Sequence, residues 1–241
     1  MKRTSLGDLL KEHEVGKVEV ERKVDTGQSD YGELCREYEE VLEARDYPER
    51  IKTIDDILAP SDINAFLQVT IKYEQHQNYD WRTGKFISQL IQISYDAGNN
   101  GFVLNTQKVK LGYLGDKIQG TEERKIELKI EGDAGNYCGS NSKDSTITIE
   151  GNVRDNCGFD SKNSTIIIRG NAGNWCGWYS NNSTITIEGN VENWCGESSN
   201  NSTFKVKNKE LYERLKTELD FKKRNTLFLI RPNGKEEVYR P

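Results

Sequence analysis

Four of the five cysteines in this 241-residue chain recur at one fixed interval, and thiols are the side chains here best suited to chemistry. They stand 19 residues apart, at Cys138, Cys157, Cys176 and Cys195. Cysteine thiolates bind zinc and iron–sulfur clusters and take part in redox reactions. A metal-binding or redox function is therefore the first hypothesis that the sequence raises.

The interval itself argues against a metal centre. The Cys-X-X-Cys pairing typical of zinc and iron–sulfur sites is missing. If residues 19 apart stack on neighbouring strands, adjacent thiols are ~4.8 Å apart and the column extends over about 14 Å. Four such thiols cannot all reach one zinc ion at about 2.3 Å. We predict that the column packs inside the protein and that there is no metal and no cofactor. Two adjacent thiols sharing a soft metal with an outside ligand remain the alternative.

The composition argues against several classes of protein. The net charge is −5 at pH 7, 34% of the residues are hydrophobic and 30% are charged. No basic block suited to a nucleic-acid backbone occurs, and the first twenty residues contain no apolar run long enough for a signal peptide or a spanning helix. We expect a cytoplasmic protein with reduced cysteines that binds neither nucleic acid nor membrane.

A 19-residue repeat determines the expected fold. Successive units read STITIEGNVRDNCGFDSKN at 145–163, STIIIRGNAGNWCGWYSNN at 164–182 and STITIEGNVENWCGESSNN at 183–201, and an earlier unit lies at 126–144. In each unit, apolar residues alternate with Thr or Lys, which is typical of a strand with one buried face. Nineteen extended residues cover about 60 Å, too far for one strand in a compact domain. We predict a mainly β chain, a single-stranded parallel β-helix of about six coils between residues 86 and 207.

Glycines mark the expected turns of each coil. Glycine adopts a positive φ at little cost, so it is favoured where the chain changes direction. The repeat-turn glycines are Gly132, Gly135, Gly139, Gly151, Gly158, Gly170, Gly173, Gly177, Gly189 and Gly196.

Two of the turns also suggest a relationship. GDAGNYCG at 132–139 and GNAGNWCG at 170–177 share the spacing G-x-x-G-x-x-x-G. This resembles the GXGXG-type β-helix domain family, which is found at the C-terminus of the large chain of glutamate synthase and in one of the polypeptides of formylmethanofuran dehydrogenase. The resemblance covers roughly residues 96–207, and the alternate units depart from it with Arg154 and Glu192 in place of the middle glycine. It implies a right-handed β-helix that has no catalytic residues and braces the catalytic parts of a larger, oxidoreductase-like complex.

Residues next to the cysteines form a column of their own. Tyr137, Asn156, Trp175 and Trp194 each precede a cysteine and must point to the opposite face. A buried, unpaired amide at Asn156 would cost roughly 1–3 kcal/mol, so we expect the cysteines to face inward and the aromatic residues outward.

The outward-facing rings predict an interaction surface, because contiguous exposed apolar area usually marks an interface. Its expected members are Tyr137, Trp175, Trp178 and Trp194, with Phe159 nearby. Three occupants are possible: residues 208–221 folding back along the coils, a partner subunit, or a carbohydrate stacking on the rings.

The two ends of the chain lack the repeat. Apolar residues at helical spacing in 31–45 and 61–75 predict helices, which would cover the open edge of the stacked strands. Near the other end, residues 208–221 predict a further helix, and PNG at 232–234 predicts the turn of a hairpin. The expected domains are a helical N-terminal cap region at 1–84, the β-helix repeats at 85–207, and a C-terminal helix and β-hairpin at 208–241.

No catalytic constellation is evident. The two histidines, His13 and His76, lie outside the repeat, and no nucleophile stands beside a base. The best group of carboxylates is Asp144, Asp155 and Asp160.

These observations predict a non-catalytic β-helix scaffold or docking module, a structural subunit of a larger complex. Its expected partner is another protein or further copies of the chain. A carbohydrate-binding or carbohydrate-active β-helix that uses the rings and the carboxylates is one alternative. A thiol- or metal-handling protein built on the cysteine column is the other.

Overall fold

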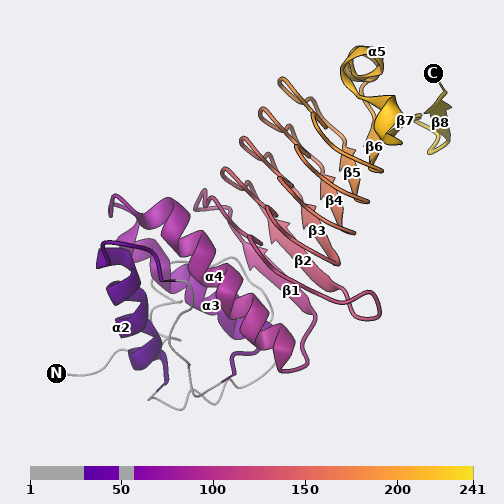
Figure 1. Ribbon diagram of the computed structural model, residues 1–241. Helices are drawn as coiled ribbons and strands as arrows, with labels where there is room; N and C mark the ends of the chain where they lie inside the picture. Colours follow the sequence, from indigo (N-terminus) through magenta and orange to yellow (C-terminus); the bar gives the residue numbers. More distant parts are fainter. Residues whose placement is uncertain (1–29, 49–56, 241) are drawn as a thin grey trace.

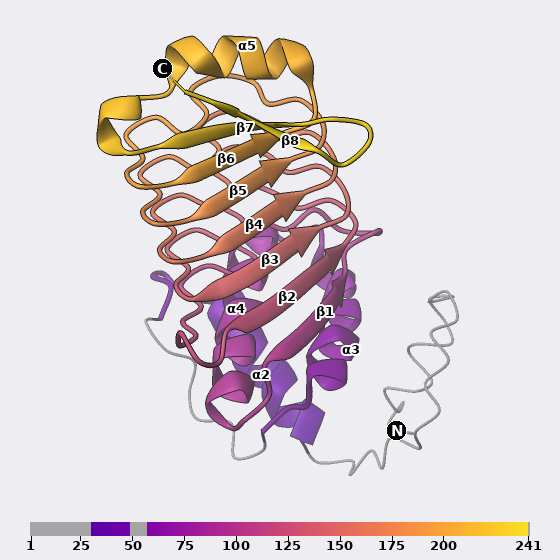
Figure 2. The ribbon, with the colours of Figure 1, turned by 90° about the vertical axis from the view of Figure 1, so that its right-hand side faces the viewer.

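The computed structural model describes residues 30–48 and 57–240, so predictions for residues 1–29 lie outside it. Its centre is one open sheet of eight strands that follow one another in chain order (Figures 1 and 2). Neighbouring strands are parallel from β1 to β7, and the last pair is antiparallel. The prediction of a mainly β chain with parallel strands is confirmed.

The strands are β1 (Gly101–Asn105), β2 (Ile126–Glu131), β3 (Ser145–Ile149), β4 (Thr165–Ile168), β5 (Thr184–Ile187), β6 (Thr203–Val206), β7 (Thr226–Ile230) and β8 (Glu236–Tyr239). The helices are α2 (Asp30–Glu43), α3 (Pro60–Thr70), α4 (Tyr79–Asp96) and α5 (Lys209–Glu218), with short 3-10 turns η1 at Ile71–Tyr73 and η2 at Phe221–Lys223. None of these helices combines the length and apolar character that crossing a bilayer requires.

The 19-residue interval sets the register of the central strands. Ile147 pairs with Ile166, and Ile166 with Ile185, so the same strand position recurs in each unit. A slip of one residue would turn every isoleucine to the opposite face, which makes this register specific. Phe102 of β1 pairs with Leu128, 26 residues later. Residues 121–125 account for five of the seven extra residues, because the offset is 24 at Gln119 and falls to 19 at Ile126.

Alternate isoleucines of the strands form the inner face, and the outer face carries threonines together with Ile167 of β4. Ile147, Ile166 and Ile185 are fully buried, while the Thr residues between them are partly exposed. The outer charges pair along the sheet: Arg169 lies 3.2 Å from Glu150 and 2.7 Å from Glu188. This is the charge pairing expected where opposite signs alternate on neighbouring strands.

Helices cover the β1 end of the sheet (Figure 1). α2 and α3 confirm the helices predicted at 31–45 and 61–75, with the second ending at Thr70. Asn64 of α3 accepts from the Asn105 N–H at 2.8 Å, and Gln68 donates to the Asn105 carbonyl at 2.9 Å. These side chains replace the strand that is missing at the open edge.

The domain boundary predicted at residue 85 falls inside α4, and the first strand begins at Gly101. The buried apolar side chains of α4 include Phe86, Ile87, Leu90 and Ile91. Polar side chains of the same helix bind the loop that follows β1: Ser88 accepts from the Gly115 N–H at 2.8 Å. α4 thus covers the loop that follows β1 at this end of the sheet.

The residues that follow the boundary predicted at residue 208 contact the strands that precede it. α5 packs on β6 and β7, and β7 continues the parallel sheet by pairing with β6. The hairpin prediction is confirmed, since β7 and β8 are antiparallel and Gly234 adopts φ +77° in the connecting turn. The C-terminal region therefore extends and closes the end of the sheet (Figure 2).

Candidate functional site

The four repeated cysteines form a buried column. Cys138, Cys157 and Cys176 are fully buried and Cys195 is 1% exposed, so the prediction that they face inward is confirmed. Leu114 takes the equivalent place before the first of them, because the Gly139 N–H donates to its carbonyl as the Gly158 N–H does to that of Cys138. Because a leucine occupies the same position as the four cysteines, this position is an apolar packing position, and a buried thiol behaves there as a small hydrophobic side chain.

The surroundings of the column favour the protonated form of two of its thiols. Contacts with neighbouring thiols, together with complete burial, raise the pKa of the Cys157 and Cys195 thiols, while hydrogen bonds from these two neighbours lower the pKa of the Cys176 thiol between them. A thiol with a raised pKa is a poor nucleophile and a poor metal ligand at neutral pH. Within 30–48 and 57–240, no three His, Cys, Asp or Glu side chains gather in a group suited to a metal ion.

Thiol titration should distinguish this column from the fifth cysteine. Cys35 in α2 is only partly buried, although burial also raises the pKa of its thiol. At pH 8 we expect one thiol per folded chain to react with a disulfide reagent, and the other four to react only at the rate of unfolding. A second thiol that titrates rapidly in the folded protein would contradict the packing role.

The predicted interaction residues are brought together on one flank. The rings of Trp175 and Trp194 stack with centroids 4.9 Å apart and an interplanar angle of 14°. Tyr137 stacks in the same way on Tyr113, also at 4.9 Å. Trp178 links the two pairs, since it lies 6.1 Å from Trp175 and 5.5 Å from Phe159, which in turn contacts Tyr137.

We call this continuous set of rings the aromatic strip. It consists of Tyr113, Tyr137, Phe159, Trp175, Trp178, Tyr179 and Trp194. Trp194 and Tyr179 are each 49% exposed, and the other rings are partly buried. α5 packs on β6 and β7. Because Trp194 and Tyr179 stay half exposed, residues 208–221 do not bury these two rings.

Asn156 is a correction to the argument that oriented this column. It shares the column with Tyr137 and Trp175 but is only 7% exposed, and its Oδ1 has no hydrogen-bond partner among the described residues. The column does face outward, as Trp194 shows, yet the smallest member is nearly buried beside larger neighbours. Its positive φ of 61° matches that of the ring residues. The successive units therefore share a backbone conformation at this position and not a common exposure of the side chain.

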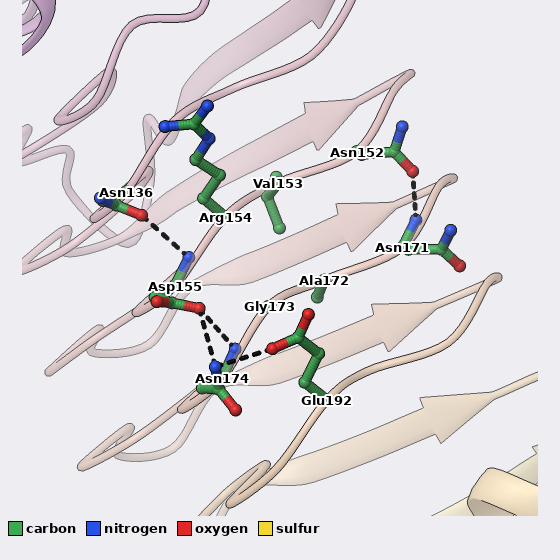
Figure 3. Close-up of a pocket in the computed structure, with 10 residues that line it drawn as sticks. All are labelled: Asn136, Asn152, Val153, Arg154, Asp155, Asn171, Ala172, Gly173, Asn174 and Glu192. Atoms are coloured by element: carbon green, nitrogen blue, oxygen red, sulfur yellow. Dashed lines mark hydrogen bonds between the residues drawn. The ribbon is translucent and has the colours of Figure 1, made fainter.

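A polar groove of about 520 Å³ lies on the stretches that lead from the strands to the cysteines (Figure 3). Its floor includes Val153, Ala172 and Gly173, and the charged side chains of Arg154 and Glu192 stand at opposite ends of it. The remaining lining residues are Asn136, Asn152, Asp155, Asn171 and Asn174.

Two ladders of amides and carboxylates run through the groove. In one, the Asn152 Oδ1 accepts from the Asn171 N–H at 2.8 Å. In the other, the Asp155 Oδ1 accepts from the backbone N–H of Asn174 at 2.8 Å and from its side-chain amide at 3.2 Å. Each ladder uses one side-chain oxygen to hold the next unit, as stacked asparagines do in other parallel β assemblies.

The carboxylate trio is not a site. Asp155 lies in the groove, Asp144 is buried and close to Lys143, and Asp160 pairs with Lys162 at 3.3 Å. Neither Asp144 nor Asp160 lines the groove.

No protein-family model, no curated protein and no solved structure matches the chain. The groove and two members of the strip, Tyr113 and Tyr179, were missed by reasoning from the sequence. Arg154 and Glu192 attracted notice only as departures from a glycine pattern, yet their alternation with glycine is the signal that could have indicated a hollow.

Proposed function

We propose that the chain is a non-catalytic scaffold that docks a partner protein on its aromatic strip within a larger complex. We further propose that the 19-residue units coil as a short single-stranded parallel β-helix. Parallel pairing at an offset of 19 supports the coil, since it recurs at the strands and at isolated bridges such as Ala172 to Val191 and Lys162 to Asn181. The right-handedness of the coil, and the proposal that the larger complex is oxidoreductase-like, are based only on the family resemblance.

The observation that carries the docking function is the fixed geometry of the strip. Rings that stack on one another are held in place before any partner arrives, so little conformational entropy is lost on binding. Tryptophan and tyrosine are the residues that most often dominate binding energy at interfaces. Trp194 and Tyr179 are half exposed and the other rings lie partly buried beside them, which gives one connected surface.

The charges at the Trp194 end of the strip indicate the chemistry of the partner, while at the other end Lys85 already lies over the Tyr113 ring, with its Nζ 4.5 Å from the centroid. Glu192 and Glu197 are exposed in the same unit as Trp194, and the Glu197 N–H donates to the Trp194 carbonyl. Aromatic faces attract cations, and an acidic rim strengthens that attraction. The occupant we propose is a protein surface that presents Lys or Arg side chains among apolar ones.

Substitution of two strip residues should remove the partner without harming the fold. We expect Trp175→Ala combined with Trp194→Ala to abolish association, because half-exposed and partly buried surface rings contribute less to folding than fully buried ones but up to several kcal/mol to binding. The measurement is the native mass of the chain purified at natural abundance from its own source. Val103→Ala is the control, since Val103 is 46% exposed and lies in β1, outside the strip.

A bare chain in this experiment would overturn the docking function. A simple multiple of the chain mass, lost in the double variant, would make a second copy the occupant instead of a different protein.

A further inference from the structure

The groove owes its shape to one position of the 19-residue unit. Arg154, Gly173 and Glu192 occupy this position in three successive units. Because Gly173 has no side chain, a hollow separates the guanidinium from the carboxylate two units away (Figure 3). A Cβ at Gly173 would lie 2.4 Å from the Asp155 Oδ1 and 2.9 Å from a backbone carbon of Arg154, so the hollow is enforced by packing.

The side chains at one end of the hollow are held in place. The Asn174 side-chain amide donates both to Asp155 at 3.2 Å and to Glu192 at 2.8 Å. This leaves the second oxygen of each carboxylate with acceptor capacity, and that of Glu192 points towards Ala172 and Gly173 (Figure 3). The polar end is therefore oriented before a ligand binds, which reduces the entropy lost on binding.

The other end supplies donors. Arg154 is exposed and makes no hydrogen bond or ion pair that joins it to another described side chain. Its guanidinium carries five N–H donors in a planar fork. The groove thus offers free donors at one end, free acceptors at the other, and apolar contact from Val153 and Ala172 between them.

A hydroxyl group both donates and accepts, so a ligand with many hydroxyls can use both ends of such a groove. One arginine against two carboxylates gives the lining a net negative charge, which disfavours an acidic ligand. The lining spans four successive units, from Asn136 to Glu192, or about 14 Å at ~4.8 Å per unit. This length suits a chain of sugars better than a single ring.

We propose that the groove binds a neutral oligosaccharide. Arg154 donates to hydroxyl oxygens, Glu192 and Asp155 accept from hydroxyl groups, and Val153 and Ala172 contact the ring faces. The groove contains no ring of the aromatic strip. Glu192 also belongs to the acidic rim proposed for docking, so Arg154→Ala is the substitution that tests the groove apart from the docking function.

The test is calorimetric titration of the full chain with cellohexaose, maltohexaose, mannohexaose and xylohexaose, each up to about 10 mM. We expect at least one of them to bind, and Arg154→Ala and Glu192→Gln each to weaken that binding about tenfold, as loss of a charged hydrogen-bonding group does. The matched controls are Glu197→Gln, an exposed glutamate of the same unit outside the groove, and Arg240→Ala at the far end of the sheet. Thermal unfolding of each variant should match that of the parent chain.

Three outcomes would overturn the proposal. In the first, none of the four sugars binds. In the second, binding survives both groove substitutions but disappears with Trp194→Ala, which would place the sugar on the aromatic strip. In the third, an oligogalacturonate of equal length binds more tightly than every neutral sugar, which would show that the class of ligand is wrong.

Discussion

Replacing Gly84 with valine is expected to lower the free energy of unfolding by about 3 kcal/mol or more, the upper end of what overpacking a core produces. Gly84 lies in α4 where the helix crosses the loop after β1, and a Cβ there would come 1.7 Å from the carbonyl oxygen of Gly112. Both partners are backbone, so no side chain can move aside. Helix and loop would have to separate, and the hydrogen bond from the Gly115 N–H to Ser88 would be strained with them.

Urea unfolding followed by circular dichroism measures this effect, and an alanine substitution at a different helical glycine provides the control. Gly32 in α2 has nothing within 4 Å of its would-be Cβ. Gly32→Ala should leave stability unchanged or raise it by up to about 1 kcal/mol, because alanine restricts the unfolded chain. Equal stability of Gly84→Val and the parent chain would mean that α4 does not pack on this loop.

The same contact explains why the start of the sheet could not be predicted. The sequence DAGNNG at 96–101 resembles the later turns, and this placed the first coil too early. The reason α4 lies where it does is the close approach of Gly84 to Gly112, which involves residues 28 positions apart. Local periodicity carries no information about such a contact.

The central strands, in contrast, were predictable because several units show the same alternation of isoleucine and threonine. Ile147, Ile166 and Ile185 each alternate with threonine, and only an offset of 19 buries all three together. The inward direction of the cysteines followed from the same alternation. The argument from Asn156 reached the correct direction for a reason that the structure does not support, since this side chain is nearly buried.

The aromatic strip was only partly predictable, and the groove not at all. Trp175 and Trp194 are 19 residues apart, so their stacking follows from the repeat. Tyr113 stacks on Tyr137 at an interval of 24, which residues 121–125 conceal. The groove depends on the absence of a side chain at Gly173. Sequence analysis considers the side chains that are present, so it did not reveal a hollow that a glycine leaves.

Replacing Cys176 with aspartate is expected to unfold the protein at pH 7 or to lower its stability by several kcal/mol. The side chain at this position is fully buried between two other thiols of the column, and an ionised carboxylate without a partner is among the most unfavourable groups to bury. Desolvation raises the pKa of such a carboxyl. The variant should therefore lose least stability below about pH 4, where the unfolded chain is also protonated, and progressively more as the pH rises towards 7.

Two further variants separate charge from packing in this experiment. Cys176→Ala removes the sulfur alone and should cost about 1 kcal/mol at every pH from 4 to 7. Cys35→Asp makes the same chemical change at a partly buried cysteine and should have a much smaller effect. If Cys176→Asp instead remained as stable as the alanine variant at pH 7, the column would have to contain water or a cation that stabilises the carboxylate. The cysteines would then be a site and not a core, and the thiol- or metal-handling function would replace the scaffold as the better hypothesis.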